Sequence, residues 1–256
     1  MTEKIRLGGM ALENGVLVHG PTAWACAVRT DEGKVKIAAE RKRVSGYRVQ
    51  APFLRGPARL ADSFGVLFRL KRALPEARLP FQNATVLASM AGTAVVVMGV
   101  RQSGLRDSAK ELLASLLSVA PALLTVRSGS LAAYHGAEHI AIGSYEQDAP
   151  HAKEHERCGS HLVGPLALTG AVANVLAAHA PARYRPAAGL AATIGGLGVT
   201  MELFGWMQRH PEKRISRVLA WPGHELQHRF STAEPSPAQL EVAEAALAAC
   251  LELEDD

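Results

Sequence analysis

The first 80 residues show the hydrophobic pattern of a small β-containing module. Two short segments, Ala23–Thr30 and Lys34–Ala39, are rich in apolar residues and flank Asp31-Glu32-Gly33. A glycine at the end of such a linker is typical of a tight turn, because glycine adopts positive φ without a steric penalty. The pattern therefore predicts a β-hairpin in this module.

A basic helix is expected over residues 58–73, further along the same module. Its apolar positions roughly follow the 3.6-residue period: Leu60, Phe64, Leu67, Phe68 and Leu70. Basic residues line its flanks: Arg59, Arg69, Lys71 and Arg72. Such a helix either docks on the module with a solvated outer face or lies on a membrane surface.

The middle of the chain contains four apolar stretches: Asn83–Val100, Leu112–Val126, His161–Ala182 and Pro186–Met201. The first and the last two approach the length that spans a bilayer, whereas the second is short. Their many Ala and Gly residues suit close helix packing in a membrane, and equally suit a soluble bundle. We expect a mainly α-helical, membrane-embedded bundle that follows the N-terminal β-containing module.

Charge and the chain ends extend this picture. Residues 1–82 hold 15 Lys/Arg against 7 Asp/Glu, which places this segment on the cytoplasmic side of a cell membrane if the helices span. No secretory signal is expected at the start, and a cytoplasmic location is the alternative. Ser236-Pro237 predicts the start of a terminal helix. The expected domains are the module (1–80), a helical bundle with a 135–160 loop (81–210), and a C-terminal tail (211–256).

Composition excludes several classes of protein. Hydrophobic residues make up 48% of the chain and charged residues 20%, which excludes wholesale disorder. The three cysteines are far apart and form no C-x-x-C pair, which excludes a disulfide framework and a cysteine-rich zinc finger. The basic module lacks interleaved aromatic residues, so no nucleic-acid partner is expected.

Histidine spacing is the main indication of chemistry. His135-Gly136-Ala137-Glu138-His139 is an H-x-x-E-H pattern, which on a helix projects both imidazoles from one face. Two imidazoles so placed can hold one metal ion, and Glu138 is positioned to accept a proton from water. The residues alone thus predict a metal site at His135 and His139.

Two further pairs repeat the spacing, namely His151–His155 and His224–His228, the second within an H-E-x-x-H pattern. Each pattern is expected by chance only about 0.02–0.03 times in such a chain. His155 is a candidate ligand of the first site. His224 follows Pro222-Gly223 in a short segment, which favours a polar surface turn over a buried zincin helix.

Ordered motifs along most of the chain resemble the YqhQ-like family (DUF1385). They are Gly8-Gly9-Met10-Ala11, Gly15-Val16 with Gly20-Pro21, Pro52-Phe53-Leu54-Arg55-Gly56, Tyr134-His135-Gly136-Ala137-Glu138-His139, His155-Glu156-Arg157-Cys158-Gly159-Ser160 and Thr232-Ala233-Glu234-Pro235. Asn14 stands where the family usually carries Glu. The family is described as predicted metal-dependent membrane enzymes of unestablished reaction.

The resemblance implies one constellation that joins His135, Glu138 and His139 to Glu146, His155 and Cys158. Tyr134 is a candidate for orienting a substrate or a ligand, although packing at a helix end explains it as well. Glu202 lies inside an apolar helix, where an ionisable residue is functional if the helix is intramembrane; it is a candidate third ligand or partner of one. Zinc is the expected metal, with iron as the alternative.

Three functions remain open from the sequence. The first is a metal-dependent hydrolase at the cytoplasmic membrane face, with Glu138 as base and a small-molecule or lipid-like substrate. The second is a histidine-rich di-iron oxidative membrane enzyme, and the third is a membrane adaptor or regulator with a structural metal. A homo-oligomer is compatible with all three.

Overall fold

The computed structural model describes residues 4–43, 46–82, 84–118, 121 and 129–255. Its N-terminal part is a four-stranded antiparallel sheet in which each strand pairs with the next along the chain. The strands are β1 (Gly8–Leu12), β2 (Gly15–His19), β3 (Ala23–Arg29) and β4 (Val35–Arg41). The hairpin predicted from Asp31-Glu32-Gly33 is the β3–β4 pair, and Gly33 has the expected positive φ of 80°.

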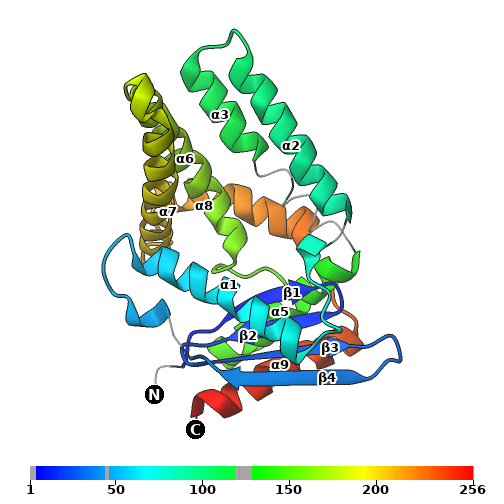
Figure 1. The fold of residues 1–256 in the computed structure, drawn as a ribbon. Helices are drawn as coiled ribbons and strands as arrows, with labels where there is room; N and C mark the ends of the chain where they lie inside the picture. Colours follow the sequence, from blue (N-terminus) through cyan, green and yellow to red (C-terminus); the bar gives the residue numbers. More distant parts are fainter. Residues whose placement is uncertain (1–3, 44–45, 83, 119–120, 122–128, 256) are drawn as a thin grey trace.

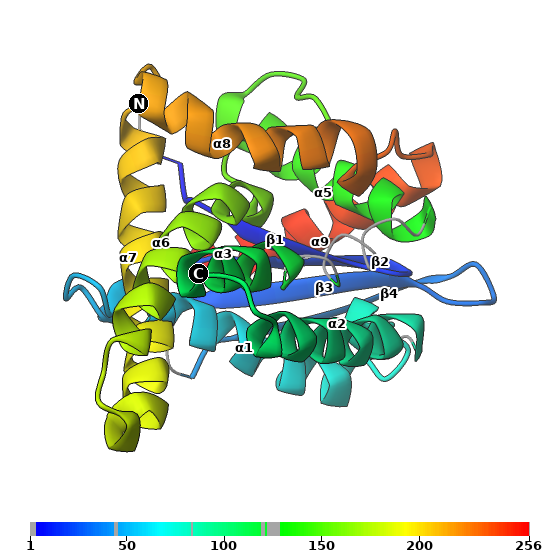
Figure 2. The same cartoon turned by 90° about the horizontal axis from the view of Figure 1, so that it is seen from above.

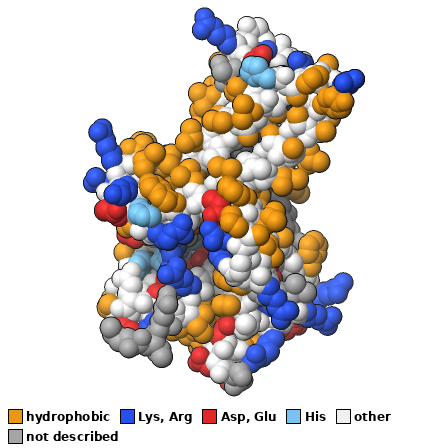
Figure 3. Space-filling view, turned by 90° about the vertical axis from the view of Figure 1, so that its left-hand side faces the viewer, with side chains coloured by type: hydrophobic (Ala, Val, Ile, Leu, Met, Phe, Trp, Pro, Cys, Tyr) orange, Lys and Arg blue, Asp and Glu red, His pale blue; other side chains and the backbone are white. Residues whose placement is uncertain are grey.

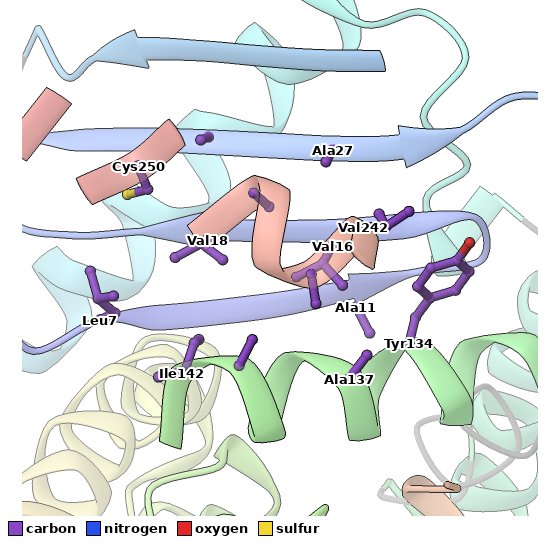
Figure 4. Packing of buried hydrophobic residues seen from close by; sticks show 14 of the residues in the cluster. Leu7, Ala11, Val16, Val18, Ala27, Tyr134, Ala137, Ile142, Val242 and Cys250 are labelled. Carbon is purple, nitrogen blue, oxygen red and sulfur yellow. The ribbon is translucent and has the colours of Figure 1, made fainter. Parts of the chain in front are cut away.

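Helices cover both faces of this sheet (Figures 1 and 2). Helices α5 (Gly129–Gln147) and α9 (Pro237–Asp255) pack on one face, against the side chains of Val16, Val18 and Ala25. Figure 4 shows Ala137 and Ile142 of α5 directed at the strands. Helix α1 (Arg55–Ala73) packs on the other face, against Leu17, Trp24 and Cys26. Because β2 and β3 are buried on both faces, their sequences are apolar throughout rather than alternating.

Two helical hairpins extend away from the sheet (Figure 1). One consists of α2 (Ala84–Gln102) and α3 (Asp107–Leu117), the other of α6 (Val163–Ala178) and α7 (Arg185–Arg209). Helix α8 (Arg214–Leu226) packs against α6 and leads into a π-helical turn, Gln227–Ser231. The protein is thus mainly helical with a small N-terminal sheet, as the sequence predicts.

The second hairpin contains two candidate membrane spans. They are Gly159–Ala178 and Ala182–Arg209, and only 17% and 11% of their most apolar windows are buried. A core helix of a soluble protein would be mostly buried, so these helices permit membrane association by length, composition and exposure. The first predicted stretch corresponds to a shorter apolar helix, Val86–Gln102. In the second, Leu112–Val126, residues 119–120 and 122–126 lie outside the described part of the chain.

The remaining expected elements are placed as follows. The basic helix predicted over residues 58–73 is α1, whose apolar residues divide between Val66, Leu67 and Leu70 on the sheet and the exposed Phe64 and Phe68. The predicted terminal helix is α9, where the backbone N–H of Gln239 donates to Ser236 Oγ at 3.4 Å. The 135–160 segment, expected as a loop, begins as the buried helix α5, because Ala137, Ala141 and Ile142 complete the core beneath the sheet.

Candidate metal centre

The H-x-x-E-H residues lie on the buried helix α5, beside a cavity of about 380 Å³. The cavity wall is formed mainly by β1, helix α5 and the 155–160 segment, and His19 and Pro80 complete it. His135, Glu138 and His139 line it from α5, and Gly9 lines it from β1. The packing of α5 against the sheet therefore fixes the position of the motif relative to β1.

The structure brings Cys158 to the two histidines of the motif. The ring centroids of His135 and His139 lie 4.3 Å apart, and Cys158 Sγ lies 3.4 Å from His135 Nε2. One ligand atom from each of the three side chains lies within 4.8 Å of the others. These three residues, the His-His-Cys cluster, form the one candidate metal site among the described residues.

Backbone carbonyls hold both imidazoles in the orientation that a metal ligand needs. His135 Nδ1 donates to the carbonyl oxygen of Ser231 at 2.7 Å, and His139 Nδ1 donates to that of Lys153 at 2.6 Å. Both rings then carry the proton on Nδ1, which leaves each Nε2 lone pair available. The π-helical turn that ends at Ser231 thus contributes the hydrogen bond that orients His135.

The protonation states of the cluster follow from burial. Burial lowers the pKa of His139 to about 2, so this imidazole is neutral, which is the form that binds metals. Burial also raises the pKa of the Cys158 thiol, which is opposed by hydrogen bonding from Ser160. A cation bound between these groups would favour the thiolate.

Glu138 lies next to the cluster as a buried carboxyl group. Burial raises its pKa to about 8, and His135 partly opposes this rise. The Glu138 side chain fits here because Gly9 has no side chain. A Cβ atom at Gly9 would lie 2.2 Å from Glu138 Oε1. Gly136 likewise allows α5 to approach the backbone at Ala233, where a Cβ atom would lie 2.2 Å from the carbonyl oxygen. In the sequence, these two glycines stand out only as parts of motifs.

A buried glutamine fixes the segment that carries Cys158. Gln227 Oε1 accepts from the backbone N–H of His155 at 2.8 Å, and Gln227 Nε2 donates to Ser160 Oγ at 2.7 Å. Gln227 belongs to the H-E-x-x-H pattern, but His224 and His228 themselves are exposed. Within that pattern, the residue that contacts the Cys158 segment is therefore Gln227, at a position where the motif accepts any residue.

Two other expected ligands, Glu146 and His155, do not join the cluster. Glu146 pairs with Arg157, and its Oε2 lies 3.4 Å from His155 Nε2. His155 Nδ1 accepts from the backbone N–H of Arg157 at 3.2 Å, so both ring nitrogens are engaged. The His155 ring nevertheless lies close, with its centroid 5.5 Å from that of His139 and 5.2 Å from that of His151.

Tyr134 and Glu202 lie apart from the cluster. Tyr134 is buried in the core between α5, the sheet and α9 (Figure 4), where burial raises its pKa. Glu202, on α7, accepts from the backbone N–H of Phe53 at 3.1 Å and from Arg55 Nε at 2.8 Å. The structure thus groups His135, His139 and Cys158 with Glu138, and it places Tyr134 in packing and Glu202 in an ion pair.

The donor set of the cluster fits a divalent transition metal. Two imidazole nitrogens and one thiolate are ligands that zinc takes in catalytic sites, where a fourth position stays open for water or substrate. Imidazole also suits iron, so the donor set alone does not distinguish the two metals. The cavity beside the cluster provides space for a small reacting group at that fourth position.

Comparison with known proteins gives one match. No curated protein and no solved structure matches the chain. Residues 128–253 match the model of a family described as "Protein of unknown function (DUF1385)". This range contains α5, the Cys158 segment and all but the last two residues of α9. The match therefore supports the family resemblance indicated by the sequence motifs over the part of the chain that holds the cluster.

Proposed function

We propose that this protein is a membrane-associated, metal-dependent hydrolase in which the His-His-Cys cluster binds one zinc ion. The observation that carries the proposal is the pair of hydrogen bonds from His135 Nδ1 and His139 Nδ1 to backbone carbonyls. Histidines that ligate metals almost always donate their second N–H in this way. His224 and His228 have the same spacing, but both are exposed and belong to no group of three potential ligands among the described residues.

Each residue of the site has a distinct part. His135, His139 and Cys158 would hold the ion, and a zinc ion so bound lowers the pKa of coordinated water to near 7. Glu138 lies on the same cavity wall as the cluster and would accept and release the reacting proton. Gly9 leaves the space in which the Glu138 carboxyl group lies.

The proposed location is a cell membrane, with the cluster on the cytoplasmic side. Helices α6 and α7 present exposed leucines along their length, including Leu168, Leu176 and Leu190. The sheet and helix α5, which carries two of the cluster residues, lie beyond one end of this hairpin (Figure 1). The Lys/Arg excess of residues 1–82 favours the cytoplasm for that side.

Cobalt substitution and a substrate panel test the proposal. Co²⁺ loaded into the full-length protein should give a thiolate-to-cobalt charge-transfer band that disappears in Cys158→Ser. Chromogenic carboxylic and phosphoric esters should be hydrolysed by the zinc-loaded parent. Glu138→Gln should keep the cobalt band and lose about 10²–10⁴-fold in rate, because it retains the ligands and removes the base.

Glu154→Gln is the matched control for that variant, since Glu154 lies outside the cavity and pairs with His228. Its rate should equal that of the parent. Full activity of Glu138→Gln would contradict the hydrolytic mechanism, and a cobalt band that persists in Cys158→Ser would contradict the ligand assignment. A non-catalytic metal protein would keep the band and hydrolyse nothing in either variant.

A further inference from the structure

A second, larger cavity adjoins the metal centre. It has a volume of about 940 Å³ and is bounded by α1, the end of α5 and the end of α7. Leu7, His155 and Arg157 line both this cavity and the smaller one beside the cluster. A ligand in the larger cavity can therefore extend towards the His-His-Cys cluster.

Arginine dominates the charged lining of this cavity, which we call the arginine chamber. Its lining includes five arginines and three glutamates. The arginines are Arg6, Arg55, Arg59, Arg157 and Arg209; the glutamates are Glu146, Glu156 and Glu202. Figure 3 shows Lys and Arg side chains gathered on one face of the molecule, below a surface of hydrophobic side chains. The chamber has a net positive lining, so it favours an anionic ligand.

Two of the arginines have no carboxylate partner among the described residues. Arg55 is paired with Glu202, and Arg157 with Glu146. Arg59 instead stacks over the Tyr47 ring, with its guanidinium carbon 4.6 Å from the ring centroid. Arg209 forms no salt bridge with any described residue, although its charge helps Arg55 to lower the pKa of Glu202. The guanidinium groups of Arg59 and Arg209 thus remain available for the bidentate contacts that phosphate oxygens accept.

The same chamber has apolar walls that continue onto the surface of the molecule. Leu60, Met201 and Phe204 line it together with the arginines. On α1, one turn and two turns beyond Leu60, Phe64 and Phe68 are 53% and 78% exposed. Helix α7 continues from the chamber into the apolar hairpin. Cationic and apolar surfaces so arranged suit a ligand with an anionic head and an apolar tail.

We propose that the arginine chamber binds the phosphate group of an amphiphile, and that this class of molecule is the substrate of the metal centre. The proposal rests on the proposed function and deepens it by naming the substrate class. Arg59 and Arg209 would bind the phosphate, and the apolar chains would leave along α1 and α7 towards the lipid. The bond to be cleaved would lie on the side of Leu7 and His155, where the chamber meets the metal cavity.

Calorimetric titration of the full-length protein in a neutral detergent tests the binding step. Three probes separate the parts of the ligand: dihexanoyl phosphatidylglycerol, glycerol phosphate and dihexanoylglycerol. The phospholipid should bind at least about tenfold more tightly than either part, since it adds charge-assisted hydrogen bonds to apolar burial. Equal affinity for glycerol phosphate would show a free-phosphate site, and equal affinity for dihexanoylglycerol a purely apolar one; each result overturns the proposal.

Arginine variants localise that binding. The double variant Arg59→Gln, Arg209→Gln should lower phospholipid affinity by about tenfold or more, because it removes the two guanidinium groups without a carboxylate partner. Arg183→Gln is the matched control, since Arg183 also stacks on a tyrosine at 4.6 Å but at the far end of the α6–α7 hairpin. Its affinity should stay within about twofold of the parent. Unchanged affinity in the double variant would overturn the assignment.

A metal-site variant separates this proposal from the proposed function. His135→Ala, His139→Ala removes two cluster ligands but leaves the arginine chamber intact. It should bind dihexanoyl phosphatidylglycerol as the parent does. If the phospholipid binds but zinc does not, the hydrolase proposal fails alone. If zinc binds but the phospholipid does not, the substrate class fails alone.

Discussion

The sheet region and the two helical hairpins use similar apolar residues in opposite ways. In the sheet region, leucine and valine side chains lie between β-strands and helices: Leu17, Val18 and Leu70 are almost fully buried. On the hairpins, Leu176, Leu190 and Val95 are each more than 60% exposed. One region completes its own hydrophobic core, whereas the other presents its apolar surface outwards.

This difference indicates different surroundings for the two regions. Large exposed apolar patches on a soluble protein mark surfaces that contact another protein or a membrane. The hairpins have such a surface along α2, α6 and α7, whereas the described residues of the sheet and α1 expose few large apolar side chains, chiefly Ile37, Phe64 and Phe68. The candidate metal centre belongs to the sheet region, because α5 is part of its core, and the segment that carries Cys158 leads directly into α6. The candidate metal centre thus lies in the well-packed region, near the point where the exposed apolar surface begins.

The most direct test of this difference between the two regions is an attempt to wash the protein off membranes. If the hairpins face lipid, the protein should stay in the membrane pellet after washes with alkaline carbonate and with high salt, since neither removes a spanning helix. Immunodetection in pellet and supernatant measures this. Release by carbonate would contradict the spanning arrangement, and release by salt would indicate attachment by charge alone.

Identical substitutions in the two regions should have very different effects on stability. Leu70→Ala, at a 0% exposed position of α1, should lower the free energy of unfolding by about 2–5 kcal/mol, because it leaves a cavity beneath the sheet. Leu176→Ala, at a 68% exposed position, should change it by less than about 0.5 kcal/mol. Denaturation in detergent, followed by circular dichroism, gives both values. Equal losses would show that the hairpin surface is buried by protein.

Buried polar groups of the sheet region should make stability depend on pH. Burial, reinforced by the Lys42 ammonium group, lowers the pKa of His19 to about 4, and the Asp62 carboxylate opposes this change. The unfolded chain, with a His pKa near 6.5, takes up this proton first as the pH falls. Stability should therefore decrease between about pH 6.5 and pH 4, by about 3 kcal/mol from this group.

His19→Gln isolates that contribution, since an amide can still contact Lys42 Nζ and Ser63 Oγ, which lie 3.4 Å from the ring nitrogens. Unfolding curves of parent and variant between pH 7 and pH 4 measure the difference. The variant should lose less stability over this interval. Parallel decreases in both proteins would show that His19 is not the group responsible.

Substitution of Gln227 tests whether its hydrogen bonds hold the Cys158 segment in place. Gln227→Ala should weaken zinc affinity by about 10–100-fold, because the His155–Ser160 segment loses the hydrogen bonds that position Cys158. Competition with a zinc chelator measures the affinity. His228→Ala, one residue further along the same motif but exposed, should keep the parent value. A larger loss of zinc affinity in His228→Ala than in Gln227→Ala would show that the H-E-x-x-H histidines take part in the metal site.

The fold was predictable where local residues determine it. Asp31-Glu32-Gly33 encodes the β3–β4 turn, Ser236-Pro237 the start of α9, and long apolar runs the α6–α7 hairpin. The sequence did not predict β1 and β2. Their glycines weaken the strand signal, and Gly9 is present because Glu138 occupies the space beside it. That requirement comes from tertiary packing, which the local pattern does not contain.

The site was predictable to a similar extent. The spacing of His135 and His139 indicates a pair on one helix face, and the family motif indicated Cys158. The part played by Gln227 was not visible, because a glutamine between two histidines has no distinct local signal. Tyr134 was a candidate for the site, yet its helical position directs it at the core, 100° around α5 from His135.

Metal content tests the central claim that the buried His-His-Cys cluster binds a metal. Three full-length proteins are purified in parallel and assayed by elemental analysis: the parent, His135→Ala with His139→Ala, and His224→Ala with His228→Ala. The account predicts one zinc ion per chain in the parent and in the second double variant, and none in the first. Zinc retained in the first variant and lost in the second would contradict the account.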